Sequence, residues 1–92
     1  MASKMVIVKR RGHREPYDER KVYGSVYAAC LAARESELSA EKISAAVAKE
    51  ITLFVKEWRV VTSDQIFREV ILKLGRHSHK AVFLYENHRD LL

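Results

Sequence analysis

Residues 5–17 have the sequence MVIVKRRGHREPY, which carries the signals of a β-hairpin. Its first part is rich in β-branched residues, as is typical of a strand, and it ends at the basic pair Lys9-Arg10. Gly12 can supply the positive φ angle that a tight turn requires, and a second short extended run follows it. We therefore predict a β-hairpin over about residues 5–17. Because proline has no amide hydrogen, Pro16 must lie on an edge strand or at the end of a strand.

After the hairpin the apolar residues recur every three or four positions, which is the period of an amphipathic helix. Asp18 and Ser39 are good N-caps for the first two helices, and Gly75 stands where a left-handed residue would end the third. The polar stretch 34–38 is expected to form a mobile loop. The predicted helices cover about residues 18–33, 39–57, 63–74 and 78–90. The predicted fold is thus mainly α with a small β part, in which an N-terminal hairpin caps a four-helix bundle.

The composition is typical of one folded domain, covering residues 1–92, because 48% of the residues are hydrophobic and 32% are charged. The only cysteine, Cys30, cannot form a disulfide within the chain and lies in an apolar run, where we expect a protonated, inert thiol. No apolar run is long enough for a signal peptide or a membrane span. We therefore expect a cytoplasmic protein with no membrane partner.

The positive charge is concentrated near the N-terminus. The net charge is +5, and residues 4–22 hold seven lysines and arginines against three acidic residues. Such a segment attracts anions, and the partner could be nucleic acid, an acidic protein or a phosphorylated small molecule.

Catalysis and metal binding have little support in the sequence. It contains no nucleophile-elbow, zinc-protease or paired-carboxylate arrangement, so we predict no catalytic residue and no enzyme activity. His77, His79 and His88 lie close together in sequence, but His79 and His88 would point in opposite directions on one helix. We therefore predict no structural metal.

Phosphate binding has more support, although not through glycine-rich loops. Glycine occurs only at positions 12, 24 and 75, so neither a P-loop nor a dinucleotide-binding fingerprint is present. Any phosphate must be held by side chains. If the hairpin folds over the first helix, Lys9, Arg10 and Lys21 converge near the positive end of that helix. The alternative is that these three residues form a solvated basic face.

Residues 6–22 resemble the opening of the ATP-cone family. Lysine, arginine, glycine, glutamate, aspartate and lysine recur at the spacing of the family pattern, here as Lys9, Arg10, Gly12, Glu15, Asp18 and Lys21. The similarity continues through residues 61–66 and, more weakly, through residues 81–85. It therefore covers nearly the whole chain.

The resemblance implies a hairpin cap over a helical bundle that binds ATP or dATP, with or without Mg²⁺, and does not hydrolyse it. It implies that Lys9, Arg10 and Lys21 hold the phosphates and that Glu15 accepts a hydrogen bond from the adenine amino group. Asp18 would lie near the base or cap the helix. Ile7 and Val22 would flank the purine. Ser63 and Phe67, both on the third helix, would approach the sugar or base.

Several positions depart from the family pattern. Arg11 replaces the usual aspartate in the turn, Tyr17 replaces phenylalanine and Val22 replaces isoleucine. Arg89 aligns with a phosphate-binding position only if one residue of the last helix is dropped, so we assign it no role.

The sequence thus predicts a non-catalytic regulatory domain that binds an adenine nucleotide and signals through its own oligomerisation or through a regulated protein partner in trans. One alternative is a small basic protein that binds nucleic acid, although the basic surplus is confined to one short segment. A third possibility is a helical protein-interaction module with a degenerate nucleotide site.

Overall fold

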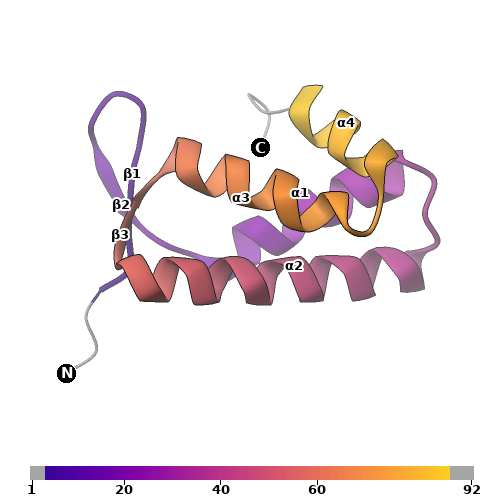
Figure 1. The fold of residues 1–92 in the computed structure, drawn as a ribbon, viewed down its shortest axis with the longest axis horizontal. Coiled ribbons are helices and arrows are strands. Elements are labelled where there is room, and N and C mark those ends of the chain that lie inside the picture. Colours follow the sequence, from indigo (N-terminus) through magenta and orange to yellow (C-terminus); the bar gives the residue numbers. More distant parts are fainter. Residues whose placement is uncertain (1–3, 88–92) are drawn as a thin grey trace.

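A helical bundle with a small sheet at one end makes up the computed structural model, which describes residues 4–87 (Figure 1). This architecture confirms the predicted class, mainly α with a small β part. The order of elements is β1 (Val6–Val8), β2 (Arg14–Pro16), α1 (Glu19–Ala32), α2 (Glu37–Trp58), β3 (Val60–Thr62), α3 (Ser63–Gly75) and α4 (His79–Asn87).

The sheet has a third strand that we did not predict. Its order is β2-β1-β3, with β1 antiparallel to β2 and parallel to β3. The residue pairs Ile7↔Glu15 and Ile7↔Val61 align across the two ladders. Strand β3 is only three residues long and lies between two helices, so it is too short to show a period of its own in the sequence.

The hairpin turn forms as predicted. Gly12 has a φ angle of 89°, and its amide donates to the Lys9 carbonyl at 2.8 Å. The Lys9 amide in turn donates to the His13 carbonyl at 2.9 Å, which closes the loop. Pro16 is the last residue of β2, an edge strand, where its missing amide hydrogen costs no ladder bond.

The first two helices begin at capping side chains, but only one of these caps was predicted correctly. Asp18 caps α1 and accepts from the amide of Arg20. Helix α2 starts at Glu37, capped by Ser36, which accepts from the amide of Ser39. The prediction of Ser39 as the cap was therefore wrong. The predicted loop at residues 34–38 was too long, because α2 already begins at Glu37. The Ser39 hydroxyl is a donor to the Glu35 carboxylate instead.

The third and fourth helices also have clear starts. Thr62 and Gln65 form a reciprocal capping box at the start of α3, and Ser78 accepts from the amide of Ala81 at the start of α4. Gly75 was predicted to end α3 in a left-handed conformation, and this was wrong: it is the last helical residue, and Arg76 follows it with φ −72°. The predicted extension of α4 to residue 90 lies outside the described residues.

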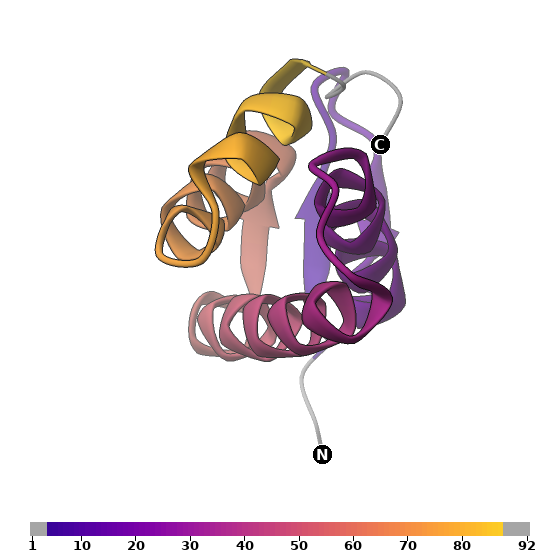
Figure 2. The same ribbon diagram turned by 90° about the vertical axis from the view of Figure 1, so that its right-hand side faces the viewer.

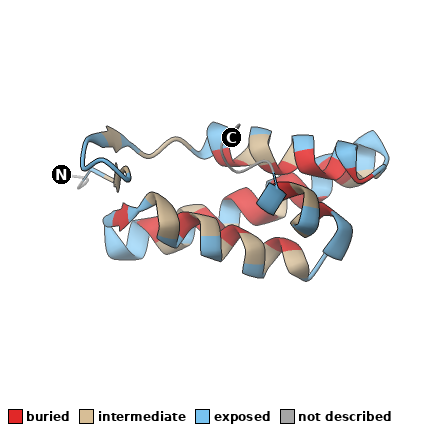
Figure 3. Cartoon of the chain, turned by 90° about the horizontal axis from the view of Figure 1, so that it is seen from above, coloured by how far each residue is buried: buried red, intermediate tan, exposed pale blue. Residues whose placement is uncertain are grey.

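The core lies between the four helices. Viewed along the bundle, α2 lies beneath α1 on one side and the pair α3 and α4 on the other (Figure 2). Buried residues form the inner faces of the helices, whereas the hairpin is mostly exposed or half-buried (Figure 3). Cys30 is fully buried among them, and desolvation raises the pKa of its thiol to about 11, so the thiol is protonated at neutral pH.

The three glycines give a test of these backbone assignments. Gly12→Ala should destabilise the domain by about 1 kcal/mol or more, because an alanine at φ 89° is strained. Gly24→Ala and Gly75→Ala should each stabilise it by up to about 1 kcal/mol, because both glycines are helical and a new Cβ meets nothing closer than 3.8 Å. Urea unfolding of the three variants measures these changes. A loss of stability in Gly75→Ala would contradict the helical assignment of Gly75.

The cap of α1 gives a second test. The hydrogen bond from the Arg20 side chain is the main reason why the pKa of the Asp18 carboxyl is below its ordinary value of 3.8. The stabilisation that the ionised Asp18 carboxylate gives to the fold is therefore complete above its ordinary pKa of 3.8. This stabilisation is lost as the pH falls through the lower pKa of the folded state. Asp18→Ala should melt several degrees below wild type at pH 7, whereas Asp18→Ser should retain most of the cap. The difference between wild type and Asp18→Ala should shrink as melting is measured from pH 5 down to pH 2; a constant difference would contradict this account.

Candidate functional site

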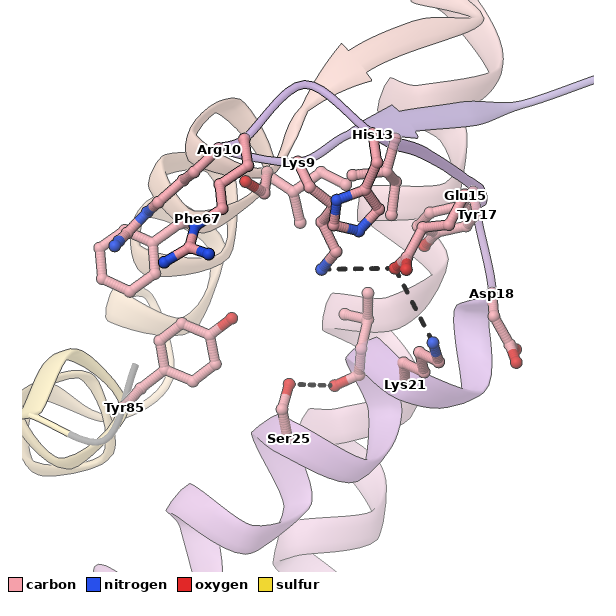
Figure 4. A pocket seen from close by; sticks show the side chains of 15 residues that line it. Lys9, Arg10, His13, Glu15, Tyr17, Asp18, Lys21, Ser25, Phe67 and Tyr85 are labelled. Atoms are coloured by element: carbon pink, nitrogen blue, oxygen red, sulfur yellow. Dashed lines mark hydrogen bonds and ion pairs between the residues drawn. The ribbon is translucent and has the colours of Figure 1, made fainter. Parts of the chain in front are cut away.

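A cavity of about 380 Å³ lies between the inner face of the hairpin and the helices beneath it (Figure 4). This volume falls in the range of small-molecule pockets in proteins. The hairpin supplies one side, the first turns of α1 another, and the start of α3 and part of α4 the remainder.

All nine residues singled out in the sequence line this one cavity. They come from the hairpin, from the start of α1 and from the start of α3, and they are Ile7, Lys9, Arg10, Glu15, Asp18, Lys21, Val22, Ser63 and Phe67. The fold therefore brings them together, although the last two are far from the others in the sequence. Their individual roles toward a ligand stay predictions.

One carboxylate holds two of the lysines. Oε1 of Glu15 lies 3.3 Å from Nζ of Lys9 and 3.8 Å from Nζ of Lys21. Figure 4 shows the carboxylate between the two ammonium groups, with Lys9 reaching it from the hairpin and Lys21 from α1. The side chain of Glu15 is only 27% exposed, compared with 70% for Lys21. The two cations thus share one half-buried counter-ion.

Further positive charge comes from the hairpin turn. Arg10 and Arg11 also line the cavity. Nε of Arg10 lies 3.8 Å from Oδ1 of Asp64 in the first turn of α3, and both side chains are about half exposed. The lining of the cavity therefore contains four lysines and arginines but only two carboxylates, those of Glu15 and Asp18, and this excess of positive charge favours an anionic ligand.

The floor of the cavity is apolar and aromatic. Ile7 points toward the helices from the central strand, and Val22 and Ile66 are buried beneath it. The rings of Phe67 and Tyr85 are stacked, with centroids 5.5 Å apart and planes inclined by 23°. A flat heterocycle could pack on such a floor while a charged group reaches the cations at the rim.

The carboxylate of Asp18 is hydrogen-bonded to Arg20 of its own helix, whereas that of Glu15 is paired with the two lysines. The Asp18 carboxylate accepts from both the backbone and the side chain of Arg20, at 3.0 and 3.1 Å from Oδ1. Figure 4 shows it directed away from the lysines. Of the two roles that the resemblance implied, the structure shows the helix cap.

Sequence reasoning missed six other residues that line the cavity: Arg11, His13, Tyr17, Ser25, Ile66 and Tyr85. Arg11 and His13 flank the turn glycine, and Ser25 lies one helical turn beyond Lys21, so local spacing could have identified them. Tyr85 could not be identified in this way, because it reaches the cavity only through the packing of α4 against α1 and α3.

Two of these residues, Tyr17 and Tyr85, contribute phenolic hydroxyl groups. The Tyr17 hydroxyl is hydrogen-bonded to Thr52 of α2 at 2.9 Å, which ties the end of the hairpin to the bundle. Burial raises the pKa of Tyr17. It also raises the pKa of Tyr85, which lies deeper in the fold. Both hydroxyls are therefore protonated at neutral pH, and Figure 4 shows that of Tyr85 directed into the cavity.

Within residues 4–87, no group of three or more His, Cys, Asp or Glu side chains is placed to hold a metal ion. His88 and Arg89 lie outside this range. Among the same described residues, no helix has the length and apolar character needed to cross a membrane.

Comparison with known proteins agrees with the fold and with the composition of the cavity. The family model described as "ATP cone domain" matches residues 5–91, which is nearly the whole chain. No curated protein matches the sequence significantly. ATP-cone domains are regulatory, non-catalytic domains that bind ATP or dATP. The match over this length shows that the chain belongs to the ATP-cone family.

Proposed function

We propose that this domain binds ATP or dATP in the cavity beneath the hairpin, does not hydrolyse it, and reports the bound nucleotide through its own oligomerisation or to a protein partner. The observation that carries the proposal is the composition of the cavity, which has lysine and arginine side chains at its rim and an apolar, aromatic floor.

The phosphates would be held by side chains from two elements. Lys9 and Arg10 extend from the end of β1, and Lys21 extends from α1, so a phosphate bound by all three links the hairpin to the bundle. Three charge-assisted contacts contribute about 5–9 kcal/mol in total, whereas association costs about 4–15 kcal/mol. The phosphates alone would bind weakly, and burial of the base must supply the remainder. We therefore expect a dissociation constant in the micromolar to sub-millimolar range.

The base would lie on the apolar floor. Ile7 and Val22 would flank the purine, and Phe67 and Ser63, at the start of α3, would approach the base and sugar. Glu15 lies on the inner face of the hairpin and would accept a hydrogen bond from the adenine amino group. Lys9 and Lys21 both pair with Oε1 of Glu15, and an ionised carboxylate has acceptor sites on two oxygens, so it retains acceptor capacity for the base.

The surroundings of the phosphates favour binding without hydrolysis. Glu15, the carboxylate beside Lys9 and Lys21, is paired with both ammonium groups, which disfavours a role as a general base. Mg²⁺, where present, would enter on the phosphate oxygens of the nucleotide, since this ion usually combines phosphates with water molecules.

Binding could be transmitted through the central strand of the sheet. The ligand would contact the hairpin, α1 and α3 together, and β1 is paired with β3, which continues directly into α3. A nucleotide in the cavity should therefore hold the hairpin against the helices and change the surface that another copy or a partner meets. Hydrogen exchange of residues 5–17 should slow when ATP is added, and equal protection with and without ATP would contradict this mechanism.

Thermal unfolding with different ligands tests the proposed function. A native-state ligand at 100 times its dissociation constant adds about 2.7 kcal/mol, which should raise the melting temperature by on the order of ten degrees. ATP or dATP should produce this shift, whereas tripolyphosphate and GTP should produce much smaller ones. The double variant Lys9→Ala/Lys21→Ala should lose the shift.

A matched control removes the same charge elsewhere. Lys42 and Lys49 are exposed on α2 and do not line the cavity, so Lys42→Ala/Lys49→Ala should keep the shift with ATP. Short duplex DNA serves as a further ligand. Stabilisation by DNA that falls steeply with salt, without any adenine-specific shift, would favour the nucleic-acid alternative and overturn the proposed function.

A further inference from the structure

Glu15 holds the two lysines that would bind the phosphates, and this arrangement links the base to the phosphates. We propose that Glu15 makes phosphate binding conditional on the base: its carboxylate opposes any phosphate ligand that lacks a hydrogen-bond donor for it, and adenine removes this penalty. The inference rests on the proposed nucleotide site and assigns the source of its selectivity.

The position of Glu15 is fixed by the sheet. Glu15 is the central residue of β2 and pairs with Ile7 of the central strand, so both side chains lie on the face of the hairpin that covers the cavity. From there its Oε1 contacts Nζ of Lys9 at 3.3 Å and Nζ of Lys21 at 3.8 Å. The negative charge is therefore held at the place where the two ammonium groups come together.

This negative charge weakens the binding of a polyphosphate that carries no base. Phosphate oxygens that approach Lys9 and Lys21 compete with the carboxylate for the same ammonium protons. They also approach a like charge in a half-buried setting, where repulsion is less screened than in water. The pair of lysines is consequently a weaker phosphate site with Glu15 than it would be without its charge.

A base with a suitable donor changes this balance. The 6-amino group of adenine can donate to Glu15, and a hydrogen bond to an ionised carboxylate is stronger than one between neutral groups. When the carboxylate accepts this bond, it competes less strongly for the N–H donors of Lys9 and Lys21. More of these donors are then available to the phosphates. A purine without the amino group gives no such compensation. The identity of the base would thus change how tightly the two lysines hold the phosphates.

The test compares three ligands with and without the charge of Glu15. The ligands are ATP, purine riboside triphosphate, which lacks only the 6-amino group, and inorganic tripolyphosphate, and their affinities are measured by calorimetry. In Glu15→Gln, tripolyphosphate and purine riboside triphosphate should bind roughly three- to tenfold more tightly, as expected for the loss of partly exposed ion pairs. ATP affinity should change by less than about threefold, because a lost charge-assisted bond offsets the lost repulsion.

Glu19→Gln is the matched control. Glu19 is an exposed carboxylate in the first turn of α1 and does not line the cavity, so this variant changes the net charge equally. It should alter the affinity for tripolyphosphate by less than about twofold. Melting temperatures of both variants verify that the fold is kept.

Two results would overturn the inference. If Glu15→Gln weakens ATP but leaves tripolyphosphate unchanged, Glu15 is only an acceptor for the base. If the substitution weakens tripolyphosphate, Glu15 serves to position the lysines. Neither result is the same as failure of the proposed function, which would appear as a wild-type protein that does not bind ATP.

Discussion

The pairing of β1 with strands on both sides is the constraint on which the cavity depends. The antiparallel ladder to β2 forms the hairpin, and the parallel ladder to β3 anchors that hairpin at the junction of α2 and α3. Val61 at the centre of β3 is buried, with only 2% of its surface exposed, so this ladder is attached to the hydrophobic core. The face of the hairpin that carries Ile7 and Glu15 is thereby held over α1 and α3. The basic residues at the end of β1 take their place from the same pairing.

Much of the fold could be predicted because its signals are local. The β-branched run before Gly12, the cap at Asp18 and the helical periods each depend on residues close together in the chain. The errors occurred where two local signals compete or where a distant partner decides. Both Ser36 and Ser39 can cap a helix, and in the structure Ser36 accepts from the Ser39 amide while the Ser39 hydroxyl donates to Glu35. Gly75 suits a left-handed cap, but the chain stays helical through it and turns at Arg76.

One part of the candidate site could likewise be predicted from the sequence, and another part could not. Its cationic side could be predicted because Lys9, Arg10, Glu15 and Lys21 lie within one short segment, and the family resemblance extended the prediction to Ser63 and Phe67. Tyr85 was assigned only to the apolar face of the last helix. Its stacking on Phe67 depends on how α4 packs across α3, which no local pattern specifies. The shared counter-ion likewise depends on side-chain geometry. In the structure one carboxylate on β2 lies between two lysines, one from the hairpin and one from α1.

The parallel pairing of β1 with β3 also affects how the chain folds. β1 is synthesised early, but its second partner follows only after α1 and α2, so this ladder closes a long loop and should form late. Until then the apolar run Met5-Val6-Ile7-Val8 has an open edge that could pair with other chains. Lys9, Arg10 and Arg11 follow it at once, as charged residues often flank aggregation-prone strands. The same cations that would attract an anionic ligand to the cavity of the finished domain are thus also placed to oppose pairing of its central strand with other chains while the domain is incomplete.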